Sequence, residues 1–260
     1  MNNFKKRLTE YFDEFFDVVS TEEKNWTVKG FIDIYQNIYA LNLDTKVLSK
    51  VIELMIFPVL AKFAHENNYK MVPCIEQNHY PDITFINEKN KDKFALDIKS
   101  TFRTSEDRVN GMTLGAFTGY FRNRKSTKNI TFAYNDYRKH YVLGIIYSRN
   151  EIESEEGKIY TINELHKISS VIKDFDFFLQ EKWKISIDRP GSGNTKNISS
   201  ANSIDELKNG TALFTKHKDG KKLFDNYWMN YMTLDMARAN DFEEPPYNNL
   251  ETYFKYKGIK

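Results

Sequence analysis

The sequence predicts an α/β (α+β) fold in which helices flank a mixed central β-sheet. Short apolar runs typical of strands are interspersed with stretches whose apolar residues recur at helical spacing. A chain of 260 residues, 40% of them hydrophobic, can bury a full core. It shows no internal repeat, low-complexity tract or obvious linker. We therefore expect residues 1–260 to form a single domain.

The first third of the chain predicts two helices and a hairpin. Apolar residues recur at helical spacing over 4–19, and their wide face must pack on the core or on a partner subunit. Residues 28–39 are β-like and are a candidate hairpin. Asp44 is a candidate N-cap for a helix over 47–64. Pro58 should kink this helix or end a turn of it.

Two of the expected strands flank a polar turn at 87–93, and they carry the residues on which the predicted site depends. The segments with strand character are 82–86, 94–99, 141–147 and 183–187. Further helices are expected near 162–168 and from 237 onwards.

Composition narrows the function classes. The net charge of +2 is too small for a non-specific DNA coat. Basic residues gather at 122–128 and 216–222, where charge alone favours solvated loops. A lone Cys74 fits a reducing cytoplasm. No apolar run approaches the roughly 20 residues of a membrane span or resembles a signal peptide, so we expect a soluble cytoplasmic protein.

Two aspartates and a lysine are candidates for catalysis. If residues 82–99 form an antiparallel hairpin, Asp82 lies across from Asp97. Side chains alternate along a strand, so Asp97 and Lys99 share a face. Such a trio is more often a set of surface ion pairs, and the bare pattern favours that interpretation. The apolar residues around Asp97 and Lys99 shift the balance, because an exposed hairpin would not need them.

The chemistry of this trio points to a divalent cation. Neighbouring carboxylates repel, and a cation such as Mg²⁺, which prefers oxygen ligands, removes that penalty. Lys99 can then stabilise the charge of a transition state or orient a water molecule. Glu53 lies inside an apolar helical run, where a metal or a lysine partner would explain it. An exposed Glu53 on the polar face of the helix is as well supported.

Four segments of the chain resemble the EcoRV-like family of type II restriction endonucleases, within the PD-(D/E)XK nuclease superfamily. They are 44–49 (DTKVLS), 77–82 (QNHYPD), 97–99 (DIK) and 191–195 (GSGNT). Weaker similarity joins them, so the resemblance spans about 43–197 and, more faintly, Tyr227 and Trp228.

The resemblance implies roles for these residues. It implies that Asp82 and Asp97 are metal ligands, that Lys99 is the catalytic lysine, and that Glu53 is an auxiliary acid and ligand. The implied cofactor is Mg²⁺, with Mn²⁺ as a substitute. The implied reaction is a double-strand break with 5′-phosphate and 3′-hydroxyl ends, and cleavage of GATATC at its centre would leave blunt ends.

Two loops are candidates for reading DNA bases. The loop at 190–197 has neither P-loop nor Rossmann spacing. Composition alone predicts a flexible hairpin tip, whereas the resemblance implies a major-groove recognition loop, with Lys196 replacing the family's threonine. A second loop, at Gln77 and Asn78, resembles a minor-groove loop. The candidate DNA contacts are Gly191, Ser192, Gly193, Asn194, Thr195, Lys196, Asn197, Gln77, Asn78, Thr45, Lys46, Ser100, Thr101 and Lys128.

A palindromic duplex implies a homodimer. We expect residues 1–40 to serve dimerisation, 43–187 to form the catalytic core and 215–260 to form a DNA-contacting arm. A cognate DNA methyltransferase should protect the host genome without being a stable subunit. Three alternatives stay open: a related nuclease with a different palindrome, a DNA-binding protein that does not cut, and a small-molecule enzyme using the same carboxylates.

Overall fold

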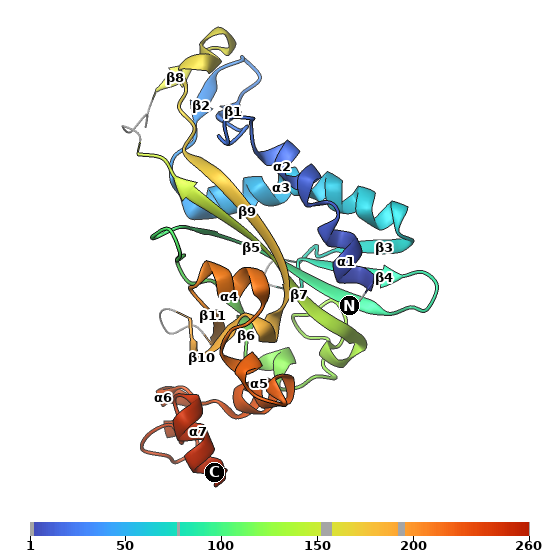
Figure 1. The fold of residues 1–260 in the computed structure, drawn as a ribbon, viewed down its shortest axis with the longest axis vertical. Coiled ribbons are helices and arrows are strands. Elements are labelled where there is room, and N and C mark those ends of the chain that lie inside the picture. The colour runs from blue at the N-terminus through green and yellow to red at the C-terminus, as the bar shows by residue number, and fades with distance from the viewer. Residues whose placement is uncertain (1–2, 77–78, 152–157, 192–195, 260) are drawn as a thin grey trace.

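A five-stranded mixed sheet forms the centre of the molecule (Figure 1). The computed structural model describes residues 3–76, 79–151, 158–191 and 196–259. The strand order is β3-β4-β5-β7-β9. The bounds are β3 (Tyr69–Pro73), β4 (Ile83–Asn87), β5 (Lys93–Phe102), β7 (Tyr137–Arg149) and β9 (Ile172–Glu181). Strands β5 and β7 run parallel and the other neighbouring pairs run antiparallel, so the predicted mixed sheet is confirmed.

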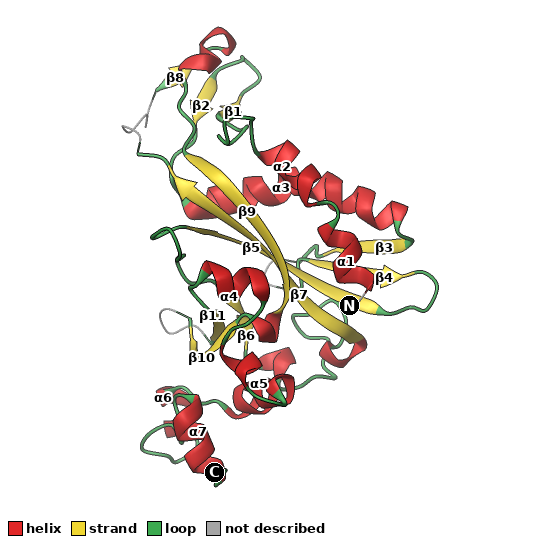
Figure 2. Ribbon diagram, viewed as in Figure 1, coloured by secondary structure: helices red, strands yellow, loops and turns green. Residues whose placement is uncertain are grey.

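Two three-stranded sheets stand apart from the central one (Figure 2). The first, β1 (Gly30–Ile32), β2 (Ile38–Ala40) and β8 (Ile159–Tyr160), lies at the top of the view. The second has the order β10-β11-β6, with β6 (Thr113–Ala116), β10 (Ser186–Pro190) and β11 (Asn197–Ser200). The hairpin expected over 28–39 is present as β1 and β2.

Helices pack on both sides of the central sheet. The α-helices are α1 (Asn3–Thr9), α2 (Phe12–Val19), α3 (Thr45–Glu66), α4 (Ile204–Asn209), α5 (Gly220–Asn230), α6 (Leu234–Arg238) and α7 (Leu250–Lys257). The 3-10 helices are η1 (Gly119–Phe121), η2 (Tyr134–Asp136), η3 (Ile162–Lys167), η4 (Lys182–Lys184) and η5 (Leu213–Lys216). In the described part of the chain, no helix has the length and apolar character that crossing a bilayer requires.

The alternation of side chains along β5 divides the core into two clusters. Leu96 points to the first cluster, which α1, α2 and α3 cover, and Ile98 packs against it. Ala95 belongs to the second cluster, which β6 and the helices of the C-terminal part cover. Asp97 and Lys99 have the same parity as Ala95, so they lie on the side of the sheet that faces β6.

Helix α3 begins as predicted but is not interrupted where expected. The Asp44 carboxylate caps it by accepting from the backbone N–H of Lys46 at 2.8 Å and of Val47 at 3.1 Å. The helix runs on through Pro58, so the proline does not end it there. Leu54, whose carbonyl loses its N–H partner to the proline, is 62% exposed, and solvent can take the place of that partner.

Other boundaries differ from the sequence-based expectations. The helix expected over 4–19 is divided into α1 and α2. The strand expected over 183–187 begins only at Ser186, because Trp183 lies in the turn η4. The helix expected near 162–168 is the 3-10 helix η3, which opens with a capping box at Thr161. Strand β9 was not predicted. Lys173, Asp174 and Asp176 interrupt its apolar residues, and the four buried residues from Phe177 to Gln180 do not alternate.

Candidate active site

The register of β4 and β5 brings the two candidate aspartates together. The strands pair antiparallel, with Ile83 opposite Leu96, so one step further places Asp82 opposite Asp97. This is the register predicted from the sequence. The Asp82 carboxylate crosses to β5, where Oδ2 accepts a hydrogen bond of 2.6 Å from the backbone N–H of Ile98.

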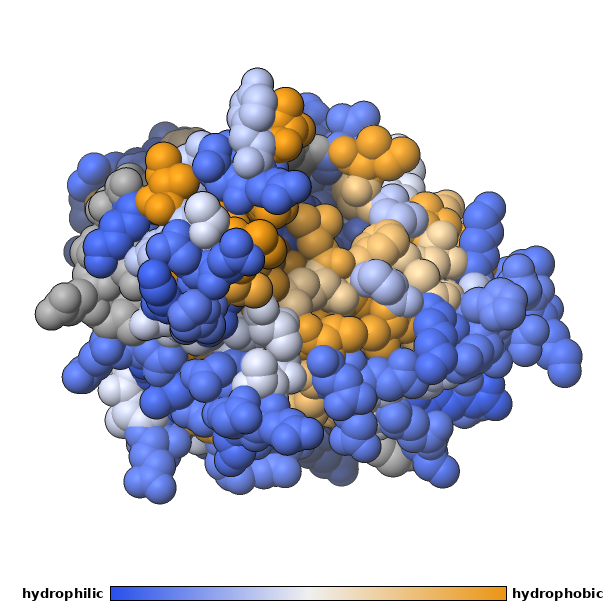
Figure 3. Space-filling model, turned by 90° about the horizontal axis from the view of Figure 1, so that it is seen from above, coloured by the Kyte–Doolittle hydropathy of each residue, from blue (hydrophilic) through white to orange (hydrophobic). Residues whose placement is uncertain are grey.

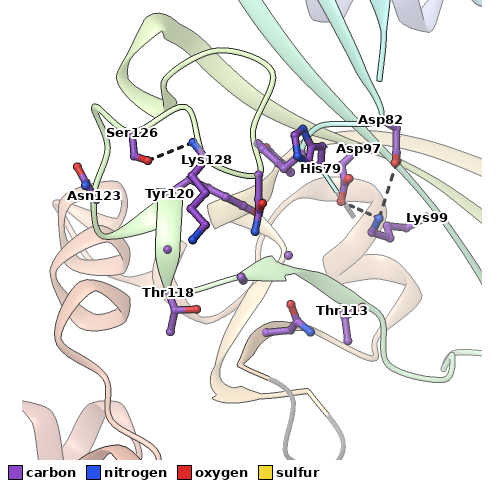
Figure 4. A pocket seen from close by; sticks show the side chains of 16 residues that line it. His79, Asp82, Asp97, Lys99, Thr113, Thr118, Tyr120, Asn123, Ser126 and Lys128 are labelled. Carbon is purple, nitrogen blue, oxygen red and sulfur yellow. Dashed lines mark hydrogen bonds and ion pairs between the residues drawn. The ribbon is translucent and has the colours of Figure 1, made fainter. Parts of the chain in front are cut away.

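Lys99 completes the cluster. Its Nζ lies 2.8 Å from Asp97 Oδ2 and 3.9 Å from Asp82 Oδ2. Figure 4 shows the three side chains converging on one wall of a cleft. Asp97 is 6% exposed, and the side chains of Lys99 and Asp82 are 26% and 32% exposed, so the group is sheltered but open on one side. The structure therefore assembles Asp82, Asp97 and Lys99 as the sequence predicts.

The electrostatics of the cluster are those of a site with surplus negative charge. Burial raises the pKa of Asp82 to about 7, and the neighbouring charge of Asp97 acts in the same direction. Lys99 and the Ile98 N–H oppose that rise. Burial alone would lower the pKa of Lys99, but Asp97 and Asp82 outweigh it and the pKa is raised. Near neutral pH, Asp82 is therefore poised to exchange its proton for a cation.

The donor set fits a divalent metal ion. Asp97 Oδ2 is buried and accepts no hydrogen bond from the described residues, although it forms the ion pair with Lys99. Two carboxylates on adjacent strands offer hard oxygen ligands and leave room for water, the environment that Mg²⁺ prefers. Asp82 and Asp97 are the residues that would hold it.

Glu53 does not join the two aspartates. Its carboxylate forms an ion pair of 2.8 Å with Lys50, one turn earlier on α3. Within the described residues, no group of three or more His, Cys, Asp or Glu side chains is arranged to hold a metal ion. Glu53 lies near enough for its negative charge to raise the pKa of Asp82. The structure therefore places it beside the site, outside the pair that would hold a metal.

The cleft in front of the cluster has a volume of about 760 Å³. Its second wall comes from β6, η1 and the loop that follows, and Lys128 lies across the cleft from the acidic pair (Figure 4). The lining residues are His79, Tyr80, Asp82, Asp97, Lys99, Thr113, Gly115, Ala116, Thr118, Gly119, Tyr120, Asn123, Ser126, Lys128, Asn129 and Asn197. Lys128 and Asn197, both predicted DNA contacts, thus share the cleft with the catalytic candidates.

The four predicted phosphate contacts on α3 and β5 divide into two groups. Thr45 and Lys46 are exposed in the first turn of α3. The Ser100 hydroxyl is hydrogen-bonded at 2.6 Å to Ser49 of the same helix, which holds the start of α3 beside the catalytic strand. Thr101 differs. It is 4% exposed and donates to the Asn110 carbonyl at 2.6 Å, so the structure does not present it to DNA.

The candidate recognition loop is anchored at the rim of the cleft. The backbone N–H of Gly191 donates to the Asn197 carbonyl at 2.9 Å, which closes the loop. Asn197 pairs with Ala116 of β6, and the Lys196 carbonyl accepts from Phe117. Lys196 itself is exposed. The remaining predicted contacts, Ser192, Gly193, Asn194, Thr195, Gln77 and Asn78, lie outside the described residues.

Sequence patterns indicate little of the aromatic wall behind the cluster. Tyr80 stacks on Tyr120 with ring centroids 5.2 Å apart, and its hydroxyl shares a hydrogen bond of 2.9 Å with Nδ1 of half-buried His140. The only available signal for Tyr80 was its place beside Asp82. The basic segment at 122–128 has two roles. Arg124 forms an ion pair of 2.9 Å with Asp225, whereas Lys128 lines the cleft.

A mixed sheet that carries paired carboxylates and a lysine on the wall of an open cleft is the architecture of a phosphodiester-cleaving nuclease. Residues 22–258 match the family described as restriction endonuclease EcoRV. The type II restriction enzyme EcoRV of Escherichia coli is 37% identical over 244 residues, which cover 92% of this chain and 95% of that enzyme. The chain belongs to the EcoRV family of restriction endonucleases.

The membership settles the general activity. The protein is a restriction endonuclease, and dependence on a divalent metal and on DNA is expected of its family. Among solved structures, the NlaIV restriction endonuclease aligns with 98% of this chain and 90% of its own, at 10% identity and a TM-score of 0.41. A likeness at that level adds nothing to the assignment.

Proposed function

We propose that the protein is a homodimeric type II endonuclease that cuts both strands of GATATC at the centre and leaves blunt ends. The observation that carries the cleavage activity is the convergence of Asp82, Asp97 and Lys99 on one wall of the cleft. The target and the cut position are those that the 37% identity to EcoRV suggests. The proposed products carry 5′-phosphate and 3′-hydroxyl ends. The proposed setting is the bacterial cytoplasm, with a cognate methyltransferase protecting the host genome.

Each residue of the cluster has a proposed task. Asp82 and Asp97 hold Mg²⁺, or Mn²⁺ in its place. When bound, the metal would neutralise the phosphodiester and lower the pKa of the attacking water. The Lys99 ammonium lies within ion-pair distance of both carboxylates, where it can stabilise negative charge that grows on the phosphate or orient the water. Glu53 is proposed as an auxiliary acid that acts through its charge.

The opposite wall is proposed to grip the DNA backbone. Lys128 offers a cation across from the acidic pair, and Asn123 and Ser126 line the cleft beside it. Thr45, Lys46 and Ser100 extend this contact surface at the start of α3. The loops at Gln77–Asn78 and at 191–197 are proposed to read the minor and the major groove.

An apolar face supports the proposed homodimer. The sheet β1-β2-β8 and the neighbouring η3 expose large hydrophobic side chains, which gather around a hollow in the view from that end of the molecule (Figure 3). They are Phe31, Ile32, Ile34, Tyr35, Tyr39, Ile159, Ile162 and Leu165, exposed by 41% to 89%. A monomeric surface seldom leaves such a patch uncovered, and a symmetric DNA site requires a two-fold partner.

Mapping the cut tests the specificity. The purified protein is incubated with plasmid DNA in Mg²⁺, with EDTA and with Lys99→Ala as controls, and the fragment ends are sequenced. Blunt ends centred in GATATC support the proposal, whereas discrete fragments cut at another palindrome refute this target. Lys196, an exposed cation at the end of the recognition loop, is the feature that favours such a different palindrome.

Light scattering tests the dimer. Ile34→Lys, at the most exposed of the patch residues (89%), should shift the protein towards the monomer. The matched control is Leu54→Lys, because Leu54 is also exposed (62%) but lies on α3, away from the patch. A wild-type protein that stays monomeric in the presence of duplex DNA would refute the proposed assembly.

A further inference from the structure

A buried lysine stands directly behind the cleft and takes no part in the mechanism above. Lys182 in η4 is 2% exposed, and its Nζ finds no hydrogen-bond acceptor among the described residues. The ammonium instead lies over two aromatic rings, 5.3 Å from the centroid of Tyr80 and 5.6 Å from that of Phe121. Tyr80 itself lines the cleft.

The lysine approaches the cleft at Gly115, where the wall carries no side chain. Gly115 of β6 lines the cleft, and a Cβ placed on it would lie 3.3 Å from Lys182 Nζ and 3.2 Å from the Tyr120 hydroxyl. Gly115 also has a φ of +89°, which disfavours any other residue. The ammonium therefore lies directly behind the Gly115 backbone, beside the Tyr120 hydroxyl, in the wall of the cleft that Asp97 also lines.

The other charges near Lys182 are already paired with each other. The charges that act on it most strongly are those of Asp97, Lys99, Asp225 and Arg124. Asp97 is paired with Lys99 at 2.8 Å, and Asp225 is paired with Arg124 at 2.9 Å. Lys182 adds a positive charge to this balance without a direct partner of its own in the described part of the chain.

The remaining titratable groups around the ammonium are neutral. His140, hydrogen-bonded to the Tyr80 hydroxyl, has its pKa held well below the usual value by burial and then by Lys182. Burial raises the pKa of Tyr120 and Tyr134 above their usual value. Burial lowers the pKa of Lys182 itself to about 8, while Asp97 pulls it upwards, so the group is mostly an ammonium at neutral pH.

A buried charge without a partner lowers the stability of the folded protein. Replacing it with an apolar residue of the same size usually leaves the free energy of unfolding unchanged or raises it. Here the charge sits where the proposed reaction brings a phosphate. A fixed cation in a sheltered wall stabilises negative charge that grows in front of it, because it needs no reorganisation.

We propose that Lys182 is a positioning residue for phosphodiester cleavage: its ammonium, held between the rings of Tyr80 and Phe121 behind Gly115, supplies a fixed positive charge to the cleft that favours the transition state. The inference rests on the proposed function. Lys182 is not itself among the residues that line the cleft. Its charge acts on the cleft across the backbone of Gly115. It also acts through the position of Tyr80, which precedes Pro81 and Asp82 in the chain.

The test compares Lys182→Met, which keeps the length of the side chain and removes its charge, with the wild type and with Lys184→Met. Lys184 lies in the same turn, but its Nζ contacts the Trp183 ring, which is not part of the cleft lining. The measurements are single-turnover cleavage at saturating Mg²⁺, duplex binding in Ca²⁺, and urea unfolding.

We expect Lys182→Met to cleave about tenfold more slowly, which corresponds to about 1.4 kcal/mol. Binding should change less than threefold, the free energy of unfolding should stay the same or rise, and Lys184→Met should behave as wild type. The ratio of the wild-type rate to the Lys182→Met rate should also fall between pH 7 and pH 9.5, as the wild-type ammonium loses its proton.

Two results would overturn the inference alone. One is cleavage by Lys182→Met at the wild-type rate. The other is a loss of stability that accounts for the loss of activity, which would make the lysine a structural residue. A wild-type protein that cuts no DNA in Mg²⁺ would instead overturn the proposed function itself, and the inference with it.

Discussion

Replacing Lys99 by Met removes a cation that lies within ion-pair distance of the two candidate metal-binding carboxylates. Its Nζ is 2.8 Å from Asp97 and 3.9 Å from Asp82, so the variant leaves two sheltered negative charges without their direct partner. Removing one member of a buried pair costs about 3–5 kcal/mol. Because 26% of the Lys99 side chain is exposed, we expect a loss of about 3 kcal/mol at pH 8, near the lower end of that range.

The loss should depend on pH and on metal. Lys99 opposes the rise in the pKa of Asp82, so without it that pKa rises further, and the folded state binds a proton that the unfolded state has released above its ordinary pKa of about 4. Stability then decreases as the pH rises from there, and the cost of Lys99→Met is smaller at pH 5 than at pH 8. Ca²⁺, which can neutralise the carboxylates, should restore much of the lost stability.

Urea unfolding at pH 5 and pH 8, in EDTA and in Ca²⁺, measures these differences. The matched control is Lys50→Met, which removes an ion pair of the same 2.8 Å length, with Glu53, from a position where Lys50 is 64% exposed. It should cost less than about 1 kcal/mol at both pH values. Lys99→Met with wild-type stability at pH 8 would refute the charge balance described for the site.

Three further substitutions test neighbouring parts of the site. Metal-free wild-type protein should lose stability between about pH 4 and 7, because folding raises the pKa of Asp82 from 3.8 to about 7. Asp82→Asn should lack this loss, a difference on the order of 2 kcal/mol after discounting for solvent exposure, and identical urea midpoints across that window would contradict it. Gly115→Ala should destabilise the protein by about 1–3 kcal/mol, because its φ is +89° and the added Cβ meets Tyr120 and Lys182; an unchanged melting temperature would argue against the tight wall. Glu53→Gln should move the acidic limb of the cleavage pH profile to slightly lower pH and slow the reaction less than tenfold, whereas complete loss of cleavage would show that Glu53 binds the metal directly.

The pairing of Asp82 with Asp97 can be predicted from the sequence because the geometry of two adjacent strands depends on residues that are close together in the chain. Alternation and the length of the polar turn predict which residues of β4 and β5 face each other, and the register of Ile83 with Leu96 bears this out. The N-cap at Asp44 is predictable for the same reason, since its hydrogen bonds lie within four consecutive residues.

The second wall of the cleft could not be predicted in this way. Gly115, Tyr120 and Lys182 come from separate elements and meet only through tertiary packing. Lys182 would ordinarily be assigned to the surface, and its burial follows from the placement of η4 after an unpredicted strand. Pro58 shows the same limit, because α3 continues through it, and the Leu54 carbonyl that loses its N–H partner belongs to an exposed residue.

The claim that Asp82 and Asp97 share one divalent ion is tested most directly by counting bound metal. Electron paramagnetic resonance can titrate Mn²⁺ into the protein held on a duplex whose scissile phosphates are replaced by an uncleavable analogue. The account predicts at least one tightly bound Mn²⁺ per chain in the wild type and its loss in Asp97→Ala. Unchanged Mn²⁺ binding by Asp97→Ala would contradict it.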